Sequence, residues 1–168
     1  MSRTLPALVA SAALAATTLL GVPTASAADA SVRDRAGDGS QRVLDITGLR
    51  LRNGDDDVRA TVRFARSGRG TVIVYLRQRG EARYGTGVIA EHRPGGTDRV
   101  RLLTSDGTAG CEGLRGRFDD AAARASFLVP STCLDAGDYG ALRASVLTER
   151  MGGADIDHTR ATDYTPRG

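Results

Sequence analysis

Polar and apolar side chains alternate along much of this chain. In residues 58–64 every second side chain is apolar, and residues 49–52 repeat the pattern. A period of two is typical of a β-strand with one buried face, because successive strand side chains point to opposite sides of the sheet. The residues between these segments, 53–57, read Asn-Gly-Asp-Asp-Asp and favour a tight turn. We therefore predict a β-hairpin over residues 49–64.

Further strands follow at regular spacing. Residues 71–76 are apolar on both faces, which predicts a central strand. Other strands are predicted over residues 83–90, 99–104, 114–118, 123–129 and 139–148. A short helix over residues 141–150 is the alternative for the last of them. Together these segments predict an all-β fold, an antiparallel β-sandwich of immunoglobulin-like or jelly-roll topology, because alternation does not encode strand order.

The N-terminal segment has the layout of a secretory signal peptide. A basic start at Arg3 is followed by an apolar run over residues 5–20 and by Ala25-Ser26-Ala27. The run is short for a membrane span, and no second apolar segment follows, so we expect cleavage before Ala28 and release without a membrane anchor. The prediction is a secreted, extracellular protein with a signal peptide (1–27), a β-sandwich domain (28–150) and a C-terminal tail (151–168). The tail is either a loose end or an edge strand.

Two cysteines, Cys111 and Cys133, are the only ones in the chain. In an oxidising compartment they predict one disulfide. A redox or metal-binding pair would need closer spacing or histidine partners, so that alternative is not favoured. If residues 119–122 form a turn, Leu114 lies opposite Phe127 and both cysteines lie near the open end of the resulting hairpin. A bend at Pro130 brings Cys133 within reach.

The basic residues comprise 23 arginines and no lysine, against 20 acidic residues. Along the chain the arginines alternate with acids rather than cluster, as in Arg33-Asp34-Arg35. The chain also has no tryptophan and few other aromatic residues. A nucleic-acid surface needs a one-sided basic face and usually stacking aromatics, so no nucleic-acid partner is predicted. We expect a monomer, and the sequence does not identify its partner.

The segment 34–40, Asp-Arg-Ala-Gly-Asp-Gly-Ser, leads to Asp45 and Ile46 before the first strong strand. Carboxylates gathered in a loop suit a hard cation, so Asp34, Asp38 and Asp45 are the predicted ligands of a structural calcium ion. A solvated loop is nevertheless the favoured interpretation, because Asp and Gly are the default turn residues. The segment resembles the opening of secreted carbohydrate-binding and DOMON-like β-sandwich domains. That resemblance implies an ion that holds a loop, with no other cofactor.

Other polar motifs are weaker. Asn53-x-Asp55-x-Asp57 has the first ligand spacings of an EF-hand loop, but Val58 stands where that loop needs glycine, so the hairpin is favoured. The two histidines, His92 and His158, belong to no metal or nucleophile motif, so no catalytic residue is assigned, although a triad assembled from distant positions is compatible with the sequence.

Four tyrosines are the only aromatic residues besides three phenylalanines. Tyr75 and Tyr84 lie on neighbouring predicted strands, and such a pair can form a small platform for a sugar ring. The alternative is that these tyrosines belong to the core or its rim.

Most of the secreted part resembles small secreted proteins of high-GC actinobacteria. The shared features are the acidic loop of residues 34–45, the alternating strands of residues 49–76 and the late cysteine pair. The resemblance implies no activity. We expect a secreted, non-catalytic β-sandwich protein with an extracellular binding or structural role. The alternatives are a small secreted hydrolase and a calcium-stabilised carbohydrate-binding module.

Overall fold

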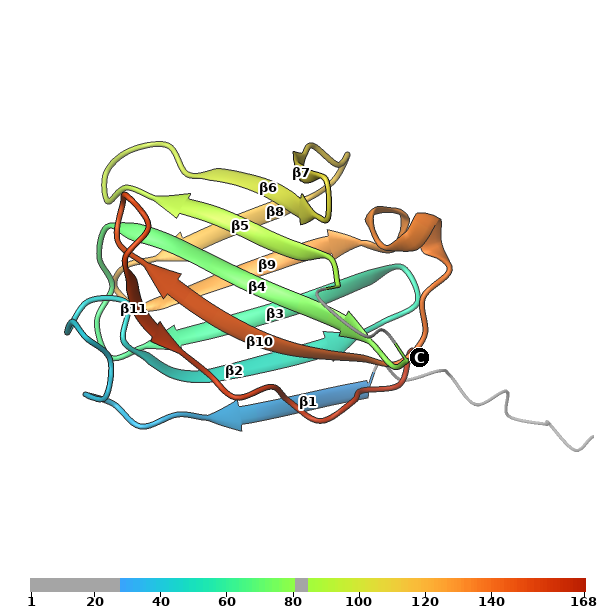
Figure 1. Ribbon diagram of the computed structural model, residues 1–168, viewed down its shortest axis with the longest axis horizontal. Helices are drawn as coiled ribbons and strands as arrows, with labels where there is room; N and C mark the ends of the chain where they lie inside the picture. The colour runs from blue at the N-terminus through green and yellow to red at the C-terminus, as the bar shows by residue number, and fades with distance from the viewer. Residues whose placement is uncertain (1–27, 81–84) are drawn as a thin grey trace, which may run out of the picture.

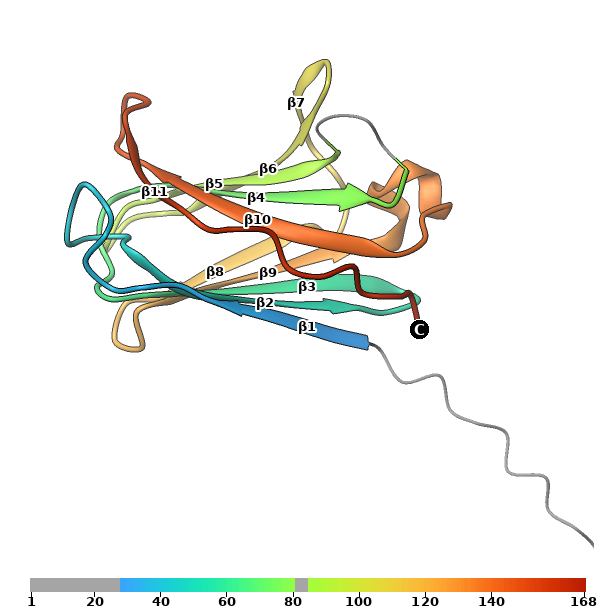
Figure 2. The same cartoon turned by 60° about the horizontal axis from the view of Figure 1, so that its bottom comes forward.

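A computed structural model describes residues 28–80 and 85–168. The described chain is almost entirely β-structure, and its strands form two antiparallel sheets that pack face to face as two layers (Figures 1 and 2). The predicted all-β sandwich is therefore confirmed. The predicted signal peptide, residues 1–27, lies outside the described residues. In the described part of the chain, no helix is long and apolar enough to cross a membrane.

One layer is a five-stranded sheet with the order β1-β2-β3-β9-β8. Its strands are β1 (Ala28–Arg33), β2 (Ile46–Asn53), β3 (Asp57–Phe64), β9 (Arg124–Pro130) and β8 (Arg115–Asp119). The predicted hairpin is the pair β2–β3, joined at the turn where Gly54 donates its N–H to the carbonyl of Asp57 (3.0 Å). Strand β1 was not predicted, and all six of its residues pair with residues 48–53 of β2.

The other layer is a six-stranded sheet with the order β11-β10-β4-β5-β6-β7. Its strands are β11 (Asp155–His158), β10 (Leu142–Glu149), β4 (Gly70–Gln78), β5 (Gly87–His92), β6 (Arg99–Thr104) and β7 (Gly107–Ala109). Strand β4 lies between β10 and β5, as its two apolar faces predict. The helical alternative for residues 141–150 is wrong. Within the described residues strand β5 begins at Gly87, so residues 85–86 of the predicted strand are not part of it, and residues 83–84 of that prediction lie outside the described part.

The core lies between the sheets and is filled by the inward-facing half of each alternating strand. Phe127, Leu51 and Val62 contribute from the five-stranded sheet, and Val74 and Leu76 face them from the other. Burial of such side chains is the main favourable contribution to folding, about 1.5–3 kcal/mol for each large aliphatic or aromatic one. The residues between them point away from this core and form the two outer faces of the sandwich.

The disulfide joins Cys111 and Cys133, with their Cα atoms 5.9 Å apart. It closes the open end of the β8–β9 hairpin, as predicted, and the chain turns after Pro130 into two short 3₁₀ turns, η1 (Ser131–Cys133) and η2 (Asp135–Gly137). The predicted register is wrong, because Gly116 and not Leu114 lies opposite Phe127.

The register error has a local cause. Asp119 still pairs with Arg124 in the ladder, so the turn spans residues 120–123 and lies one residue later than expected. A hydrogen bond from Ala122 N–H to the Asp119 carboxylate (3.0 Å) and the left-handed conformation of Ala123 (φ 45°) hold this turn.

Residues 159–165 extend the edge of the six-stranded sheet beyond β11. Thr159, Thr162 and Thr165 follow at every third position, and their N–H groups donate to alternate carbonyls of β10 (2.6–2.9 Å). The hydroxyls of Thr159 and Thr162 accept the β10 N–H groups between those carbonyls (3.1 Å each). Side-chain oxygens thus replace backbone acceptors, and the edge of β10 is covered over its whole length.

Candidate functional site

The predicted acidic loop packs against β11 and brings three carboxylates together. Ligand oxygens of Asp38, Asp45 and Asp157 all lie within 4.8 Å of one another. Asp45 and Asp157 are buried, whereas Asp38 is exposed. Asp34, the third predicted ligand, is not part of this cluster. Its place is taken by Asp157, which is separated from Asp45 by more than 100 residues of chain and carries no local sequence signal.

Both buried carboxylates accept backbone hydrogen bonds. The oxygens of Asp45 accept from Gly37 (2.7 Å) and Gly39 (3.2 Å). Those of Asp157 accept from Ile46 and His158 (2.7 Å each). These bonds join the N-terminal loop, β2 and β11, so the cluster ties the two sheets together.

The ionised form of Asp157 is disfavoured in this setting. Burial raises the pKa of its carboxyl, and the charges of Asp34 and Asp38 add to that rise, while the two backbone N–H bonds oppose it. Ionisation of Asp157 beside two other carboxylates is therefore electrostatically unfavourable. A cation with oxygen ligands would relieve this repulsion, and Asp38, Asp45 and Asp157 are the residues that could hold one.

His92, at the end of β5, is buried, and both of its ring nitrogens and one face of its ring have partners. Its Nδ1 lies 2.7 Å from Asp98 and its Nε2 lies 2.8 Å from Asp120, and the ring stacks on Phe118 of β8 at 4.0 Å between centroids. Ser67 donates a hydrogen bond to the same Asp120 oxygen, and among the described residues its hydroxyl has no hydrogen bond to the histidine. The bond from Ser67, with a smaller contribution from His92, lowers the pKa of Asp120 against the opposing effect of burial.

This arrangement differs from a Ser-His-Asp triad. A general base needs one ring nitrogen free to take the proton of the nucleophile, and both nitrogens of His92 already bind carboxylates. The ring instead joins β5 of one sheet to β8 of the other. His158 lies exposed on β11, opposite Leu147.

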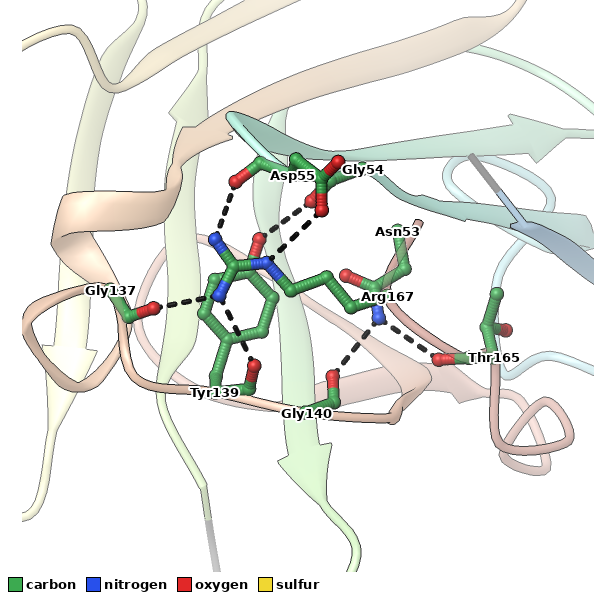
Figure 3. Close-up of polar contacts among 8 residues, drawn as sticks. All are labelled: Asn53, Gly54, Asp55, Gly137, Tyr139, Gly140, Thr165 and Arg167. Atoms are coloured by element: carbon green, nitrogen blue, oxygen red, sulfur yellow. Dashed lines mark hydrogen bonds and ion pairs between the residues drawn. The ribbon is translucent and has the colours of Figure 1, made fainter. Parts of the chain in front are cut away.

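The C-terminus forms a third link between the sheets, around Arg167 (Figure 3). The guanidinium donates hydrogen bonds to the carbonyls of Gly137 (2.7 Å), Tyr139 (3.3 Å) and Asp55 (2.6 Å). It also lies over the Tyr139 ring, 4.3 Å from the centroid, and the phenol of that tyrosine donates to the carbonyl of Gly54 (2.9 Å). The β2–β3 turn is thereby held against the C-terminal segment.

Asn53 anchors the same region. Its fully buried amide donates to the carbonyls of Gly140 (3.1 Å) and Thr165 (2.9 Å) (Figure 3). Asp57, on the following strand, binds the guanidinium of Arg59 (3.0 Å). The motif Asn53-x-Asp55-x-Asp57 is therefore a hairpin turn, as predicted, and its three side chains point to different partners.

The tyrosines are partly used in packing. Tyr139 is buried, and Tyr164 lies between the guanidiniums of Arg79 (5.2 Å) and Arg143 (5.0 Å). Tyr75 is half-buried on the outer face of β4. The proposed pair of Tyr75 and Tyr84 involves a residue outside the described part of the chain.

The largest concentration of one chemical group lies on the outer face of the five-stranded sheet. Eight exposed arginines point outward from its strands, and we call this surface the arginine face. They are Arg33, Arg50, Arg52, Arg59, Arg63, Arg115, Arg117 and Arg124. Three aspartates share the surface, namely Asp29, Asp57 and Asp119. No aromatic side chain points outward from these five described strands.

The strand register arranges this surface as rows. The middle row runs Ser31, Arg50, Thr61, Ser126 and Arg117 across the five strands. Arg50, Arg59 and Arg124 each bind one of the three aspartates at 2.8–3.0 Å. Among the described residues, the other five arginines have no carboxylate within ion-pair distance. The expectation that the arginines do not cluster is therefore wrong, because they alternate with apolar residues within strands that the fold places side by side.

No protein-family model matches this chain, and a search of curated proteins also gave no match.

Proposed function

We propose that this chain is a secreted, non-catalytic binding domain whose ligand-binding surface is the arginine face. The observation that carries the proposal is the one-sided charge of this surface, with eight arginines against three aspartates. Exposed charges that lack partners inside the protein contribute little to folding. They do attract and orient an oppositely charged partner, and the effect grows when many charges of one sign share a surface.

The outer face of the six-stranded sheet has a different distribution of charge from the arginine face. Its outward arginines, such as Arg99 and Arg101, are interspersed with Glu91 and Glu149, and Arg101 binds Glu91 at 3.3 Å. Its middle row is apolar, with Leu147, Ile73 and Ile89 side by side. The two outer faces therefore differ in charge, and this difference supports the arginine face as the binding surface.

The hydrolase alternative has weaker support. Its best candidate base, His92, has both ring nitrogens bonded to carboxylates, and the nearby Ser67 hydroxyl bonds to Asp120 and not to the ring. The other histidine, His158, is exposed and has no side-chain hydrogen bond within the described residues. Neither arrangement supplies an activated nucleophile.

Retention on the cell envelope tests the proposal. The full-length gene is expressed with its leader in a secreting bacterial host, and the protein is measured in the envelope fraction and in the medium at low salt. We expect envelope binding that is released by sodium chloride and lost when Arg52, Arg63 and Arg117 are changed together to Gln. A control variant carries Arg42→Gln, Arg99→Gln and Arg160→Gln, three exposed arginines away from the arginine face, at the same net charge. Equal release of both variants would contradict the proposal.

A structural calcium ion is a second and separate proposal. It is supported by the convergence of Asp38, Asp45 and Asp157 oxygens within 4.8 Å, two of these side chains being buried. Such an ion would stabilise the loop between β1 and β2 against β11 and would take no part in binding at the arginine face. Binding to the folded state alone must raise the melting temperature.

Thermal unfolding with calcium and then with excess EDTA tests the ion. We expect a calcium-dependent rise in melting temperature that is lost in Asp38→Asn, a change at an exposed side chain with no hydrogen bond of its own among the described residues. The matched control is Asp34→Asn, which lies outside the cluster and should keep the response. No rise at millimolar calcium in the unaltered protein would contradict the proposal.

A further inference from the structure

The arginine face contains two pairs of like charges in direct opposition. Arg52 of β2 lies opposite Arg59 of β3, and Arg63 of β3 lies opposite Arg124 of β9. Like charges directly across an antiparallel ladder destabilise a sheet. Arg59 and Arg124 are each partly offset by an aspartate, but Arg52 and Arg63 have no such partner among the described residues. The fold therefore carries a repulsion that an anionic ligand would relieve.

The same face is hollowed next to one of these pairs. A depression of about 760 Å³ opens over β1, β2, β3 and β9. Gly48 contributes to its floor and has no side chain to fill it, at the point where a bulge shifts the β2–β3 register. Arg33, Arg50, Arg63 and Arg124 line it together with Asp29, which binds Arg50. An anionic group that enters is therefore approached by guanidiniums from four strands, and those of Arg33 and Arg63 have no ion-pair partner among the described residues.

Arginine side chains in this setting favour phosphate. The planar guanidinium presents a fork of N–H donors that binds two oxygens of a phosphate or carboxylate at once. Neighbouring strands are about 4.8 Å apart, and outward residues on one strand repeat at about 6.7 Å, so the surface offers a grid of such forks. A flexible chain with regularly spaced anions can follow this grid, whereas a rigid rod such as duplex DNA contacts only part of it.

The absence of aromatic residues on these strands limits the ligand further. Unpaired bases are normally held by stacking on aromatic side chains, and sugar rings are commonly held on aromatic platforms. The outward positions of the five strands offer neither. Binding is therefore expected through the anions alone, with little recognition of what lies between them.

We infer that the arginine face binds a flexible linear polymer that carries a phosphodiester in every repeat and has no bases, such as a polyol phosphate. This inference rests on the proposed function and specifies its ligand class. Each arginine that neutralises a phosphate releases counterions, so affinity must fall linearly with salt on logarithmic axes.

Binding of purified poly(glycerol phosphate) to the full secreted, oxidised protein tests the inference. Isothermal titration calorimetry at several sodium chloride concentrations gives the affinity and its salt slope. The Arg52→Gln, Arg63→Gln, Arg117→Gln variant should bind more weakly, and its salt slope should be shallower by about two to three, because each arginine that no longer neutralises a phosphate reduces the slope by about one. The Arg42→Gln, Arg99→Gln, Arg160→Gln control should keep both the affinity and the slope.

Thermal unfolding of the same variants separates binding from folding. Removing Arg52 and Arg63 relieves two like-charge pairs, so the melting temperature of the triple variant should rise or stay unchanged while its binding falls. A loss of binding that accompanies a lower melting temperature would overturn the inference, because the arginines would then be structural.

Two further polymers decide the ligand class. Polygalacturonate, which carries carboxylates on sugar rings, and a short duplex DNA should both bind more weakly per charge than poly(glycerol phosphate). If either binds as tightly, the ligand class is wrong, and envelope retention that still depends on the three arginines leaves the proposed function standing. If both triple variants lose binding and retention equally, whole-protein charge is responsible and both proposals fail.

Discussion

The two outer faces of the sandwich are built on the same alternation and differ in what they expose. At the centre of the five-stranded sheet, Thr61 lies between Arg50 and Ser126. At the centre of the six-stranded sheet, Ile73 lies between Leu147 and Ile89 and is only 6 % exposed. The inner faces must both be apolar to fill one core, whereas nothing in folding requires eight arginines on one outer face. Charge without a folding role is the reason for proposing that face as the binding surface.

The polar residues that look most like a catalytic or metal site from the sequence have a structural role in common. The carboxylate of Asp157, the ring of His92 and the guanidinium of Arg167 each link the two sheets through hydrogen bonds, and the carboxylate of Asp45 holds the loop between β1 and β2. Of the eight arginines on the outer face, three bind aspartates of the same sheet, and the other five have no ion-pair partner among the described residues. The number of partners within the protein therefore separates side chains that stabilise this fold from those available to a ligand.

Loss of the disulfide should have the largest effect on the stability of the protein. A Cys111→Ser, Cys133→Ser variant should be less stable to urea by about 3 kcal/mol, because a 22-residue separation is no longer cross-linked in the unfolded chain. It should also weaken the polymer binding, since the bridge secures the end of β8, which carries Arg115 and Arg117. Equal stability of the oxidised protein and the variant would contradict this role.

Truncating the central outward side chain of each sheet should have a smaller effect on stability, and the effect should differ between the two faces. Ile73→Ala should lower the free energy of unfolding by about 2 kcal/mol, because it removes most of a nearly buried aliphatic side chain. Thr61→Ala, at the centre of the arginine face, should change it by less than about 0.5 kcal/mol. Urea denaturation of the two single variants measures both values, and similar losses would mean that the arginine face is also packed for stability.

Relief of one like-charge pair should give a gain of stability. Arg52→Thr should raise the free energy of unfolding by up to about 1 kcal/mol at low salt, and the gain should shrink as salt screens the repulsion. On the other face, Arg101→Thr should lower it slightly, because Arg101 binds Glu91 at 3.3 Å. A loss of stability in Arg52→Thr would show that repulsion between Arg52 and Arg59 does not lower the free energy of unfolding.

The smallest expected effect on stability is the pH dependence that comes from the Asp157 carboxyl. Because the pKa of Asp157 is raised in the folded state, the folded protein binds its proton more tightly than the unfolded chain does. Stability from this group is therefore greatest below the ordinary value of 3.8 and falls as pH rises through the folded pKa. Urea midpoints against pH in a calcium-free buffer should show this fall, and Asp157→Asn should remove it. An unchanged slope in the variant would assign the fall to another group.

Much of the fold was predictable because period-two alternation assigns each side chain to a face without knowledge of its neighbours. That is why the β2–β3 hairpin and the central strand β4 were predicted correctly, while the disulfide followed from the presence of only two cysteines. Strand β1 was missed although Ala28, Ala30 and Val32 alternate with polar residues, because the acidic residues around it resemble a loop. The β8–β9 register was wrong by the position of one turn residue, which alternation cannot locate.

The functional surface was not predictable, because it depends on which strands are neighbours. Arg52 and Arg63 alternate with apolar residues in the sequence, so each was known to point outward. Their clustering with Arg117 follows only from the pairing of β3 with β9 and of β9 with β8. Asp157 was missed for the same reason, since its contact with Ile46 spans 111 residues.

The most direct test of the arginine face as the binding surface is an NMR titration that follows the Nε–Hε signals of the arginines as poly(glycerol phosphate) is added. We predict that the signals of Arg33, Arg52, Arg63 and Arg117 shift while those of Arg99 and Arg101 on the opposite sheet stay in place. Shifts confined to the six-stranded sheet, or equal shifts on both faces, would contradict the account.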